Sequence, residues 1–223
     1  MKMIEAVIFD MDGLMFDTEK LAVRALLETG KKFGYEGISE IVPIVTGVNA
    51  ERTKKICIER MGESFPYAEF MHYRQNLIDR HIEEHGVPVK PGLKELLAYL
   101  KREGYRMAVA TSTSRAHAVE YIEKAGVLPF FDTVVCGDML KKSKPDPDIY
   151  LKAAEALGEA PGDCMALEDS PNGVASAYAA GMKTVMVPDL IAFGEEQEKQ
   201  VYACVPSLFD VIPVLQGLRE ENG

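Results

Sequence analysis

From residue 87 onwards the chain alternates between short apolar runs and amphipathic segments, and this alternation limits the possible fold more than any other feature. Each apolar run is rich in Val, Ala and Met, as buried strands are, and each amphipathic segment repeats its apolar residues with helical spacing. Alternation of this kind predicts a parallel sheet with helices on both faces. The sequence contains strand patterns within 105–115, 131–138, 163–170 and 182–189, and helical patterns within 87–104, 116–127, 146–158 and 172–181.

A further strand is expected near Met3–Phe9, and it is separated from the others by a long helical segment. The segments 49–62 and 66–86 both have helical periodicity, and each ends at a glycine, which commonly stops a helix. We therefore expect an α/β fold whose core is a doubly wound parallel sheet. Residues 1–16 and 88–223 would form this core, and residues 17–87 would form an inserted, all-helical cap subdomain.

Composition and charge narrow the class of protein. Of the 223 residues 47% are hydrophobic, which is ordinary for a globular protein, and the formal net charge is −10. Such an acidic chain repels nucleic acids and anionic membranes, so neither is expected as a partner. The N-terminus lacks a signal-peptide pattern, and the four cysteines lack metal-ligand spacing. These features predict a cytoplasmic protein with free thiols, and we expect a monomer.

Polar side chains follow the predicted strands. Asp10 and Asp12 follow the first strand, Thr111 ends the second, and Lys144 comes after the third. The fourth strand ends in Glu168, Asp169 and Ser170. Ligands of open parallel sheets bind outside the carboxyl ends of the strands, so these side chains are expected to converge on one site.

Each of these groups has a simpler interpretation as a turn, a helix cap or a solvated charge. Together, however, they place several carboxylates at one edge of the sheet, where they would repel one another without a cation. Hard cations prefer oxygen ligands, and Mg²⁺ combines few protein carboxylates with substrate phosphate oxygens. The sequence therefore favours a Mg²⁺ site at this edge of the sheet.

Motifs in four places resemble those of the haloacid dehalogenase superfamily of hydrolases, in its β-phosphoglucomutase-like branch with a helical cap. The first is "FDMDGLMFDTE", which begins at Phe9, and the second is "VATSTSR", which contains Thr111. The third is "KSKPDPDIY" around Lys144, and the fourth is "ALEDSPNG" around Asp169. One departure is Ser143, which stands where a glycine is common.

The resemblance implies a Rossmann-like core and assigns roles to residues. Asp10 would be the nucleophile and Asp12 the general acid and base, while Lys144 and Thr111 would bind the phosphoryl oxygens. The resemblance also implies sets of ligands. Magnesium would be held by Asp10, the backbone carbonyl of Asp12, Glu168 and Asp169, and the substrate-binding candidates are Thr18, Gly47, Ser112, Arg115 and Asn172.

The expected function is hydrolysis of a small phosphorylated metabolite, such as a sugar or polyol phosphate, through an aspartyl-phosphate. A phosphosugar mutase of the β-phosphoglucomutase type is the alternative. It is less favoured because Ala22, Thr46 and Ala50 stand where the mutase has a histidine, a lysine and an arginine. A non-catalytic binding module is a third hypothesis, but it predicts a broken motif, and Asp10 and Lys144 are both present.

Overall fold

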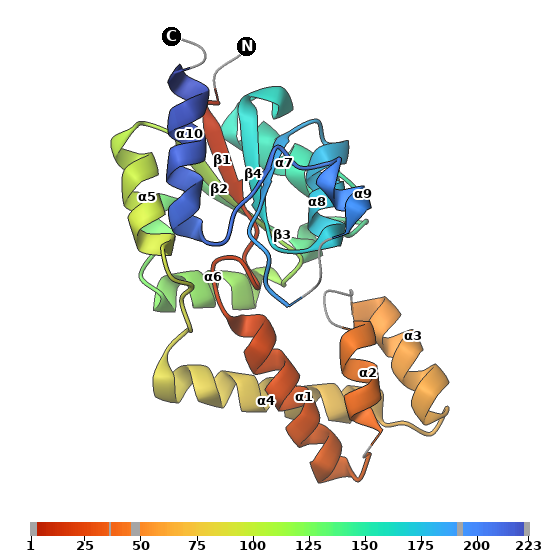
Figure 1. Ribbon diagram of the computed structural model, residues 1–223. Coiled ribbons are helices and arrows are strands. Elements are labelled where there is room, and N and C mark those ends of the chain that lie inside the picture. The colour runs from red at the N-terminus through yellow and green to blue at the C-terminus, as the bar shows by residue number, and fades with distance from the viewer. Residues whose placement is uncertain (1–3, 36, 46–49, 191–193, 221–223) are drawn as a thin grey trace. The chain divides into compact units, whose positions relative to one another are not determined.

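Six parallel strands form one sheet in the order β3-β2-β1-β4-β5-β6 (Figure 1). The computed structural model describes residues 4–35, 37–45, 50–190 and 194–220. Because the chain starts in the middle of the sheet and builds outward in both directions, the sheet is doubly wound, as expected. The strands are β1 (Ala6–Phe9), β2 (Arg106–Thr111), β3 (Thr133–Cys136), β4 (Cys164–Glu168), β5 (Lys183–Met186) and β6 (Ala203–Cys204).

The chain divides into two compact units. One consists of Met1–Phe16 and Val89–Gly223 and contains the sheet, and the other is Asp17–Pro88. The helices of the first unit are α5 (Leu93–Arg102), α6 (Arg115–Lys124), α7 (Asp148–Leu157), α8 (Pro171–Ala179), α9 (Glu195–Glu198) and α10 (Val211–Glu220). Short 3₁₀ turns lie at Leu128–Phe130, Gly137–Met139, Pro161–Asp163 and Leu208–Asp210.

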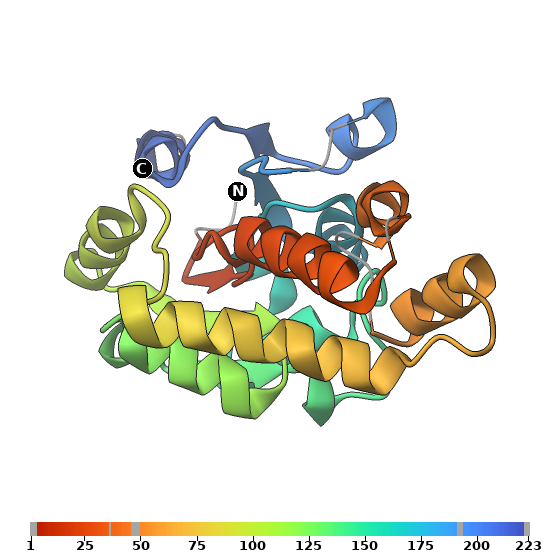
Figure 2. The ribbon, with the colours of Figure 1, turned by 90° about the horizontal axis from the view of Figure 1, so that it is seen from below.

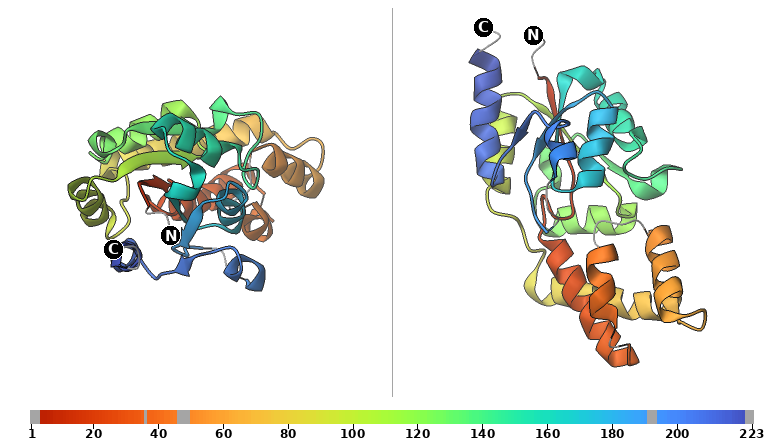
Figure 3. Two further views of the ribbon diagram at one scale, coloured as in Figure 1. Left: turned by 90° about the horizontal axis from the view of Figure 1, so that it is seen from above. Right: turned by 45° about the vertical axis from the view of Figure 1, so that its right-hand side comes forward.

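Helices cover both faces of the sheet. On one face, Ile8 of β1 and Ala108 of β2 pack in one apolar cluster with Ala153 of α7 and Ala177 of α8. Right-handed crossovers place α5 and α6 on the opposite face. Helix α10 packs beside α5, and Figures 2 and 3 show these two helices side by side. The strands are therefore buried on both faces, which explains why their sequences are continuously apolar rather than alternating.

The second unit is entirely helical in its described part. It contains α1 (Thr18–Phe33), α2 (Ile38–Val45), α3 (Ala50–Met61) and α4 (Tyr67–His85). Helix α1 packs against α2 and α4, and α3 packs against the same two helices. Its core is formed by Leu26, Ile38, Ile41, Cys57, Phe65 and Phe70.

The first loop after β1 folds back on itself before the chain leaves the sheet. The backbone N–H groups of Met15 and Phe16 both donate to the carbonyl of Met11, at 2.9 and 3.1 Å, and Gly13 N–H donates to Phe16 at 2.8 Å. Phe16 also forms a β-bridge with Val89, where the chain returns. This tight turn keeps Asp12 close to the end of β1.

The expected α/β class with a doubly wound parallel sheet is confirmed. The first strand begins at Ala6 rather than Met3, and residues 1–3 lie outside the described part of the chain. Among the helices that the structure describes, none combines the length and apolar character needed to cross a membrane.

Candidate active site

The carboxyl ends of β1 and β4 place three carboxylates together. Asp10 follows β1, Glu168 ends β4 and Asp169 comes next, and one oxygen from each lies within 4.8 Å of the others. The register explains this meeting, because Phe9 pairs with Leu167 and the residues after them emerge at the same edge. All three carboxylates are buried, so they form one acidic cluster inside the protein.

Lys144 reaches the acidic cluster from the loop between β3 and α7. Its Nζ donates to Oδ1 of Asp10 at 2.5 Å and to Oε1 of Glu168 at 2.6 Å. A third hydrogen bond, of 3.0 Å, runs to the carbonyl oxygen of Ala110 at the end of β2. An ammonium group has three donors, and these three contacts are the shortest, because the hydroxyl oxygen of Tyr150 lies further from Nζ, at 3.4 Å. A buried charge is tolerated when it is paired and hydrogen-bonded in this way.

Glu168 is held through both of its carboxylate oxygens. Besides Lys144, Oε1 accepts a 2.6 Å hydrogen bond from the hydroxyl of Tyr150, which is fully buried on α7. Oε2 accepts from the backbone N–H groups of Asp169 and Ser170, at 3.1 and 3.4 Å, and from the Ser170 hydroxyl at 3.2 Å. The orientation of Glu168 is therefore fixed by α7 and by the start of α8.

The protonation state of Asp10 depends on its burial and on the charged groups around it. Burial raises the pKa of Asp10 well above its usual value, the carboxylates of Glu168 and Asp12 act in the same direction, and Lys144 opposes them. Burial acts against the charge on Lys144, but its two carboxylate partners outweigh burial and raise its pKa. Lys144 is therefore cationic, and a further positive charge nearby would favour the ionised form of Asp10.

The acidic cluster fits a hard divalent cation. Its donors are all oxygens, and three carboxylates face the single ammonium group of Lys144, so negative charge exceeds positive charge in this group of four. Two glycines give the carboxylates room, because a Cβ on Gly13 would overlap the carboxylate of Asp169, and a Cβ on Gly173 would overlap that of Glu168. Gly13 also has φ +89°, which side chains disfavour.

Asp12 contacts the loop that follows β2. The hydroxyl of Thr113 donates to Oδ2 of Asp12 at 2.7 Å, and the hydroxyl of Thr111 lies 3.4 Å from the same oxygen. Thr111 Oγ1 in turn accepts a 3.1 Å hydrogen bond from the backbone N–H of Thr113. The first and second motifs of the sequence thus meet through these hydroxyl groups.

The structure brings together the catalytic and metal-binding candidates expected from the sequence, namely Asp10, Asp12, Thr111, Lys144, Glu168 and Asp169. The substrate-binding candidates belong to both units of the chain or lie outside the described residues. Ser112 and Asn172 are exposed, and Arg115 donates from its guanidinium to the carbonyl of Val134 at 3.3 Å. Thr18 is buried at the start of α1 in the helical unit. Gly47 and Thr46 lie outside the described residues, as does the side chain of Ala50.

Two residues in these contacts, Thr113 and Tyr150, have no role assigned to them from the sequence, although Thr113 is expected at this edge of the sheet with Thr111, Ser112 and Ser114. The signal for Thr113 is its place in the loop directly after β2, which predicts a position at the edge of the sheet where ligands bind. Tyr150 is the last residue of the third motif, "KSKPDPDIY", but the motif alone does not reveal that its hydroxyl reaches Glu168. The Tyr150 hydroxyl reaches Glu168 because α7 packs across β1, β2 and β3.

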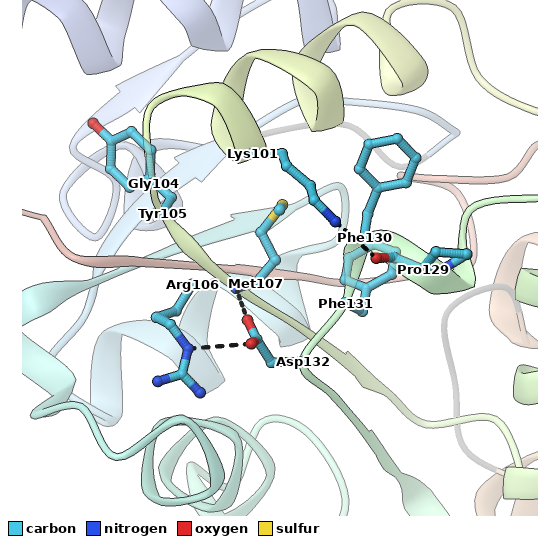
Figure 4. Close-up of a pocket in the computed structure, with 9 residues that line it drawn as sticks. All are labelled: Lys101, Gly104, Tyr105, Arg106, Met107, Pro129, Phe130, Phe131 and Asp132. Atoms are coloured by element: carbon cyan, nitrogen blue, oxygen red, sulfur yellow. Dashed lines mark hydrogen bonds and ion pairs between the residues drawn. The ribbon is translucent and has the colours of Figure 1, made fainter.

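A separate depression of about 220 Å³ lies at the opposite end of β2 (Figure 4). Its charged groups are engaged with protein atoms, since Arg106 pairs with Asp132 at 3.2 Å and Lys101 donates to the carbonyl of Pro129 at 3.3 Å. The acidic cluster is the better candidate for catalysis, because it gathers buried ionisable groups at the edge of the sheet where ligands bind.

The sequence model of one protein family and a related phosphatase each match most of this chain. Residues 7–187 match the sequence model of the haloacid dehalogenase-like hydrolases. A phosphorylated carbohydrates phosphatase from Thermotoga maritima is 32% identical over 182 residues, which cover 82% of this chain and 84% of that protein.

Solved structures agree with the sequence match. The crystal structure of CbbY from Rhodobacter sphaeroides in complex with phosphate has a TM-score of 0.76 and 29% identity, and the match covers 94% of this chain and 96% of that one. A β-phosphoglucomutase from Clostridium difficile has a TM-score of 0.81 and covers 99% of both chains, but at 22% identity it shows the fold alone. With the family match spanning most of the sequence and the acidic cluster at the expected edge of the sheet, this chain belongs to the haloacid dehalogenase-like hydrolase family.

Proposed function

We propose that the protein is a Mg²⁺-dependent phosphatase that hydrolyses a small phosphorylated sugar or polyol through an aspartyl-phosphate. The observation that carries this proposal is the buried ion pair of Asp10 and Lys144 at the end of β1, with Asp12 two residues further on. A carboxylate in this position can attack phosphorus, and a second carboxylate can serve the proton transfers.

In the first step a carboxylate oxygen of Asp10 attacks the phosphorus atom of the substrate. The new bond joins this oxygen to phosphorus, and the bond between phosphorus and the alcohol oxygen breaks. The electron pair of the broken bond stays on the alcohol oxygen, which takes a proton from the carboxylic acid of Asp12. The products are the free alcohol, a phosphoryl group on Asp10 and a carboxylate on Asp12.

In the second step Asp12 acts as a base. A water molecule attacks phosphorus and gives one proton to the Asp12 carboxylate. The bond between phosphorus and the Asp10 oxygen breaks, its electron pair returns to Asp10, and inorganic phosphate leaves. Both aspartates are then in their starting states, so the cycle balances.

Residues around Asp10 would hold the phosphoryl group. Lys144 brings positive charge to the nucleophile, and Thr111, at the end of β2, would turn its hydroxyl donor from Asp12 to a phosphoryl oxygen. Asp10, Glu168 and Asp169, with the backbone carbonyl of Asp12, would hold Mg²⁺. When bound, Mg²⁺ supplies positive charge that reduces the repulsion between the anionic nucleophile and the phosphoryl oxygens.

Substrate choice would depend on groups outside the acidic cluster. We assign residues 17–87 the role of a cap that covers the substrate, and the core comprises residues 1–16 and 88–223. The candidates for substrate contact remain those expected from the sequence, namely Thr18, Gly47, Ser112, Arg115 and Asn172. The preference for a carbohydrate phosphate is supported by the name of the Thermotoga maritima relative. All these candidate residues belong to one chain, so the proposed reaction does not require a second subunit, and we propose a monomer.

A β-phosphoglucomutase-type mutase is the second candidate, and the fold shared with the Clostridium difficile enzyme favours it. A mutase has to hold a bisphosphate at both ends. The uncharged residues Ala22, Thr46 and Ala50 argue against this, because a charge-assisted contact to a phosphate contributes about 1.5–3 kcal/mol.

The experiment combines a screen of phosphorylated metabolites with metal removal. Phosphate release is measured for each compound with Mg²⁺ and after addition of excess chelator, and β-glucose 1-phosphate is also tested for conversion to glucose 6-phosphate in the presence of a glucose bisphosphate. We expect Mg²⁺-dependent release of phosphate from sugar or polyol phosphates. Undiminished activity in chelator would contradict the metal requirement, and isomerisation faster than phosphate release would favour the mutase.

A further inference from the structure

We infer that Thr113 is a positioning residue that orients Asp12 for proton transfer to the leaving group. This inference rests on the proposed function, because it takes Asp12 as the general acid. The carrying observation is the 2.7 Å hydrogen bond between Oγ1 of Thr113 and Oδ2 of Asp12, which links the loop after β2 to the turn after β1.

The backbone of Thr113 is anchored on both sides. Its N–H donates to Oγ1 of Thr111 at 3.1 Å, and its carbonyl accepts from the N–H of Gly137 at 3.2 Å. Gly137 can approach this closely because it lacks a side chain, as a Cβ there would overlap the backbone of Ser112. The hydroxyl of Thr113 is therefore presented to Asp12 from a fixed backbone.

Thr113 is better placed than Thr111 to hold Asp12. The Thr111 oxygen lies 3.4 Å from Oδ2 of Asp12, a weak distance for a hydroxyl donor, and the same oxygen already accepts a hydrogen bond from Thr113. Thr111 thus supports the loop and remains close to the phosphoryl site, whereas Thr113 makes the short contact.

A hydroxyl group suits a residue that changes its protonation state. Asp12 has to be a carboxylic acid before the first step and a carboxylate after it. A hydroxyl can donate to the carboxylate and accept from the acid, so it can hold Asp12 in both states. A lysine or arginine in the same place could only donate, and it would favour the carboxylate alone. Loss of the hydroxyl should therefore weaken orientation in both halves of the cycle.

The test uses a series of substituted phenyl phosphates. These substrates have nearly the same shape, but their leaving groups differ in basicity. A strongly basic leaving group needs a proton from Asp12 as it departs, whereas a weakly basic one does not. The quantity measured is kcat/KM, because it covers the steps up to departure of the phenol. The second step, hydrolysis of the phosphoryl group on Asp10, is common to every substrate in the series.

Four variants accompany the wild type. Thr113→Val removes the hydroxyl but keeps the branched shape, and Thr113→Ser restores a hydroxyl. Asp12→Asn removes the general acid itself. Thr184→Val is the matched control, because Thr184 is buried on β5 and its hydroxyl has no hydrogen-bond partner among the described residues. Thermal unfolding of each variant establishes that the fold is retained.

We expect Thr113→Val to steepen the dependence of kcat/KM on leaving-group basicity. It should lose roughly 10- to 100-fold on phenyl phosphate, within the range of general acid catalysis, and much less on p-nitrophenyl phosphate. Thr113→Ser should recover most of the loss, and Thr184→Val should match the wild type.

Each remaining outcome has a definite meaning. An equal loss across the series, or a change in KM alone, would overturn the positioning role and indicate that Thr113 contacts the substrate or supports the fold. If Asp12→Asn itself leaves the dependence on leaving group unchanged, the general acid assignment in the proposed function is wrong. If Asp12→Asn steepens it but Thr113→Val does not, only the inference about Thr113 is wrong.

Discussion

Nζ of Lys144 lies 2.5 Å from Oδ1 of Asp10, and the side chains of both residues are almost completely buried. This hydrogen-bonded ion pair connects the end of the first strand to a loop more than a hundred residues later in the chain. Because removal of either partner would leave a buried charge uncompensated, breaking this pair should affect folding as well as the proposed chemistry.

Lys144→Met should therefore lower both stability and activity. Without the ammonium group, the buried carboxylates of Asp10 and Glu168 lose their shared cation, and breaking a buried pair costs about 3–5 kcal/mol. Phosphatase activity should fall by roughly 10²-fold or more, since a charge that stabilises the phosphoryl group is lost. Urea unfolding without metal and steady-state kinetics with Mg²⁺ measure the two effects.

The control for this change is Lys142→Met. Lys142 pairs with Asp146 at 3.0 Å, but its side chain is 64% exposed. A solvent-exposed ion pair contributes little to stability because water screens it, so this variant should remain close to the wild type. Equal losses in the two variants would contradict the importance of the buried pair.

Tyr150→Phe should destabilise the protein through Glu168. The change removes the 2.6 Å hydrogen bond to Oε1 and leaves the ring in place. A hydrogen bond to a charged group contributes about 1.5–3 kcal/mol, and the free energy of unfolding should fall by an amount of this order. Tyr99→Phe on α5 is the matched control, because it removes a hydroxyl from a buried tyrosine outside the acidic cluster. The prediction fails if the two variants are equally stable in urea.

Gly13→Ala should impair metal use more than stability. The new Cβ would overlap the carboxylate of Asp169, and φ at Gly13 is +89°. Gly158 is the matched control, because its φ is +74° and no atom lies within 4 Å of a Cβ built there. Both alanine variants should lose about 1–2 kcal/mol from the left-handed backbone conformation.

Only Gly13→Ala should raise the Mg²⁺ concentration that gives half-maximal activity. Calorimetric titration of Mg²⁺ into the two variants provides a second measurement that does not depend on turnover. If Gly13→Ala and Gly158→Ala bind Mg²⁺ equally well, Asp169 does not need the space that Gly13 provides.

The positions of the carboxylates were predictable because they follow from topology. Once the apolar runs are recognised as parallel strands, Asp10 and Glu168 must emerge at the same edge, whatever the details of packing. The same argument predicts that Thr111, at the end of β2, lies near Asp12. These inferences need only the period of the pattern and the direction of the strands.

The roles of Tyr150 and Thr113 were not predictable, because they depend on distances between segments. Tyr150 reaches Glu168 only because α7 packs over the sheet, and its place at the end of the third motif does not reveal this contact. Thr113 reaches Asp12 because Gly137 anchors the loop after β2. A periodic pattern cannot predict such contacts, because it indicates which face of a helix or strand is buried but not which residues pack against that face.

The central claim is that Asp10 carries the phosphoryl group during turnover, and peptide mapping by mass spectrometry tests it most directly. The enzyme is mixed with p-nitrophenyl phosphate and Mg²⁺, quenched in acid within the first turnovers and digested. We predict an added phosphoryl mass on the peptide that contains Asp10, absent in Asp10→Asn, and a loss of turnover in that variant of orders of magnitude. A phosphoryl group on another residue, or near-normal turnover by Asp10→Asn, would contradict the account.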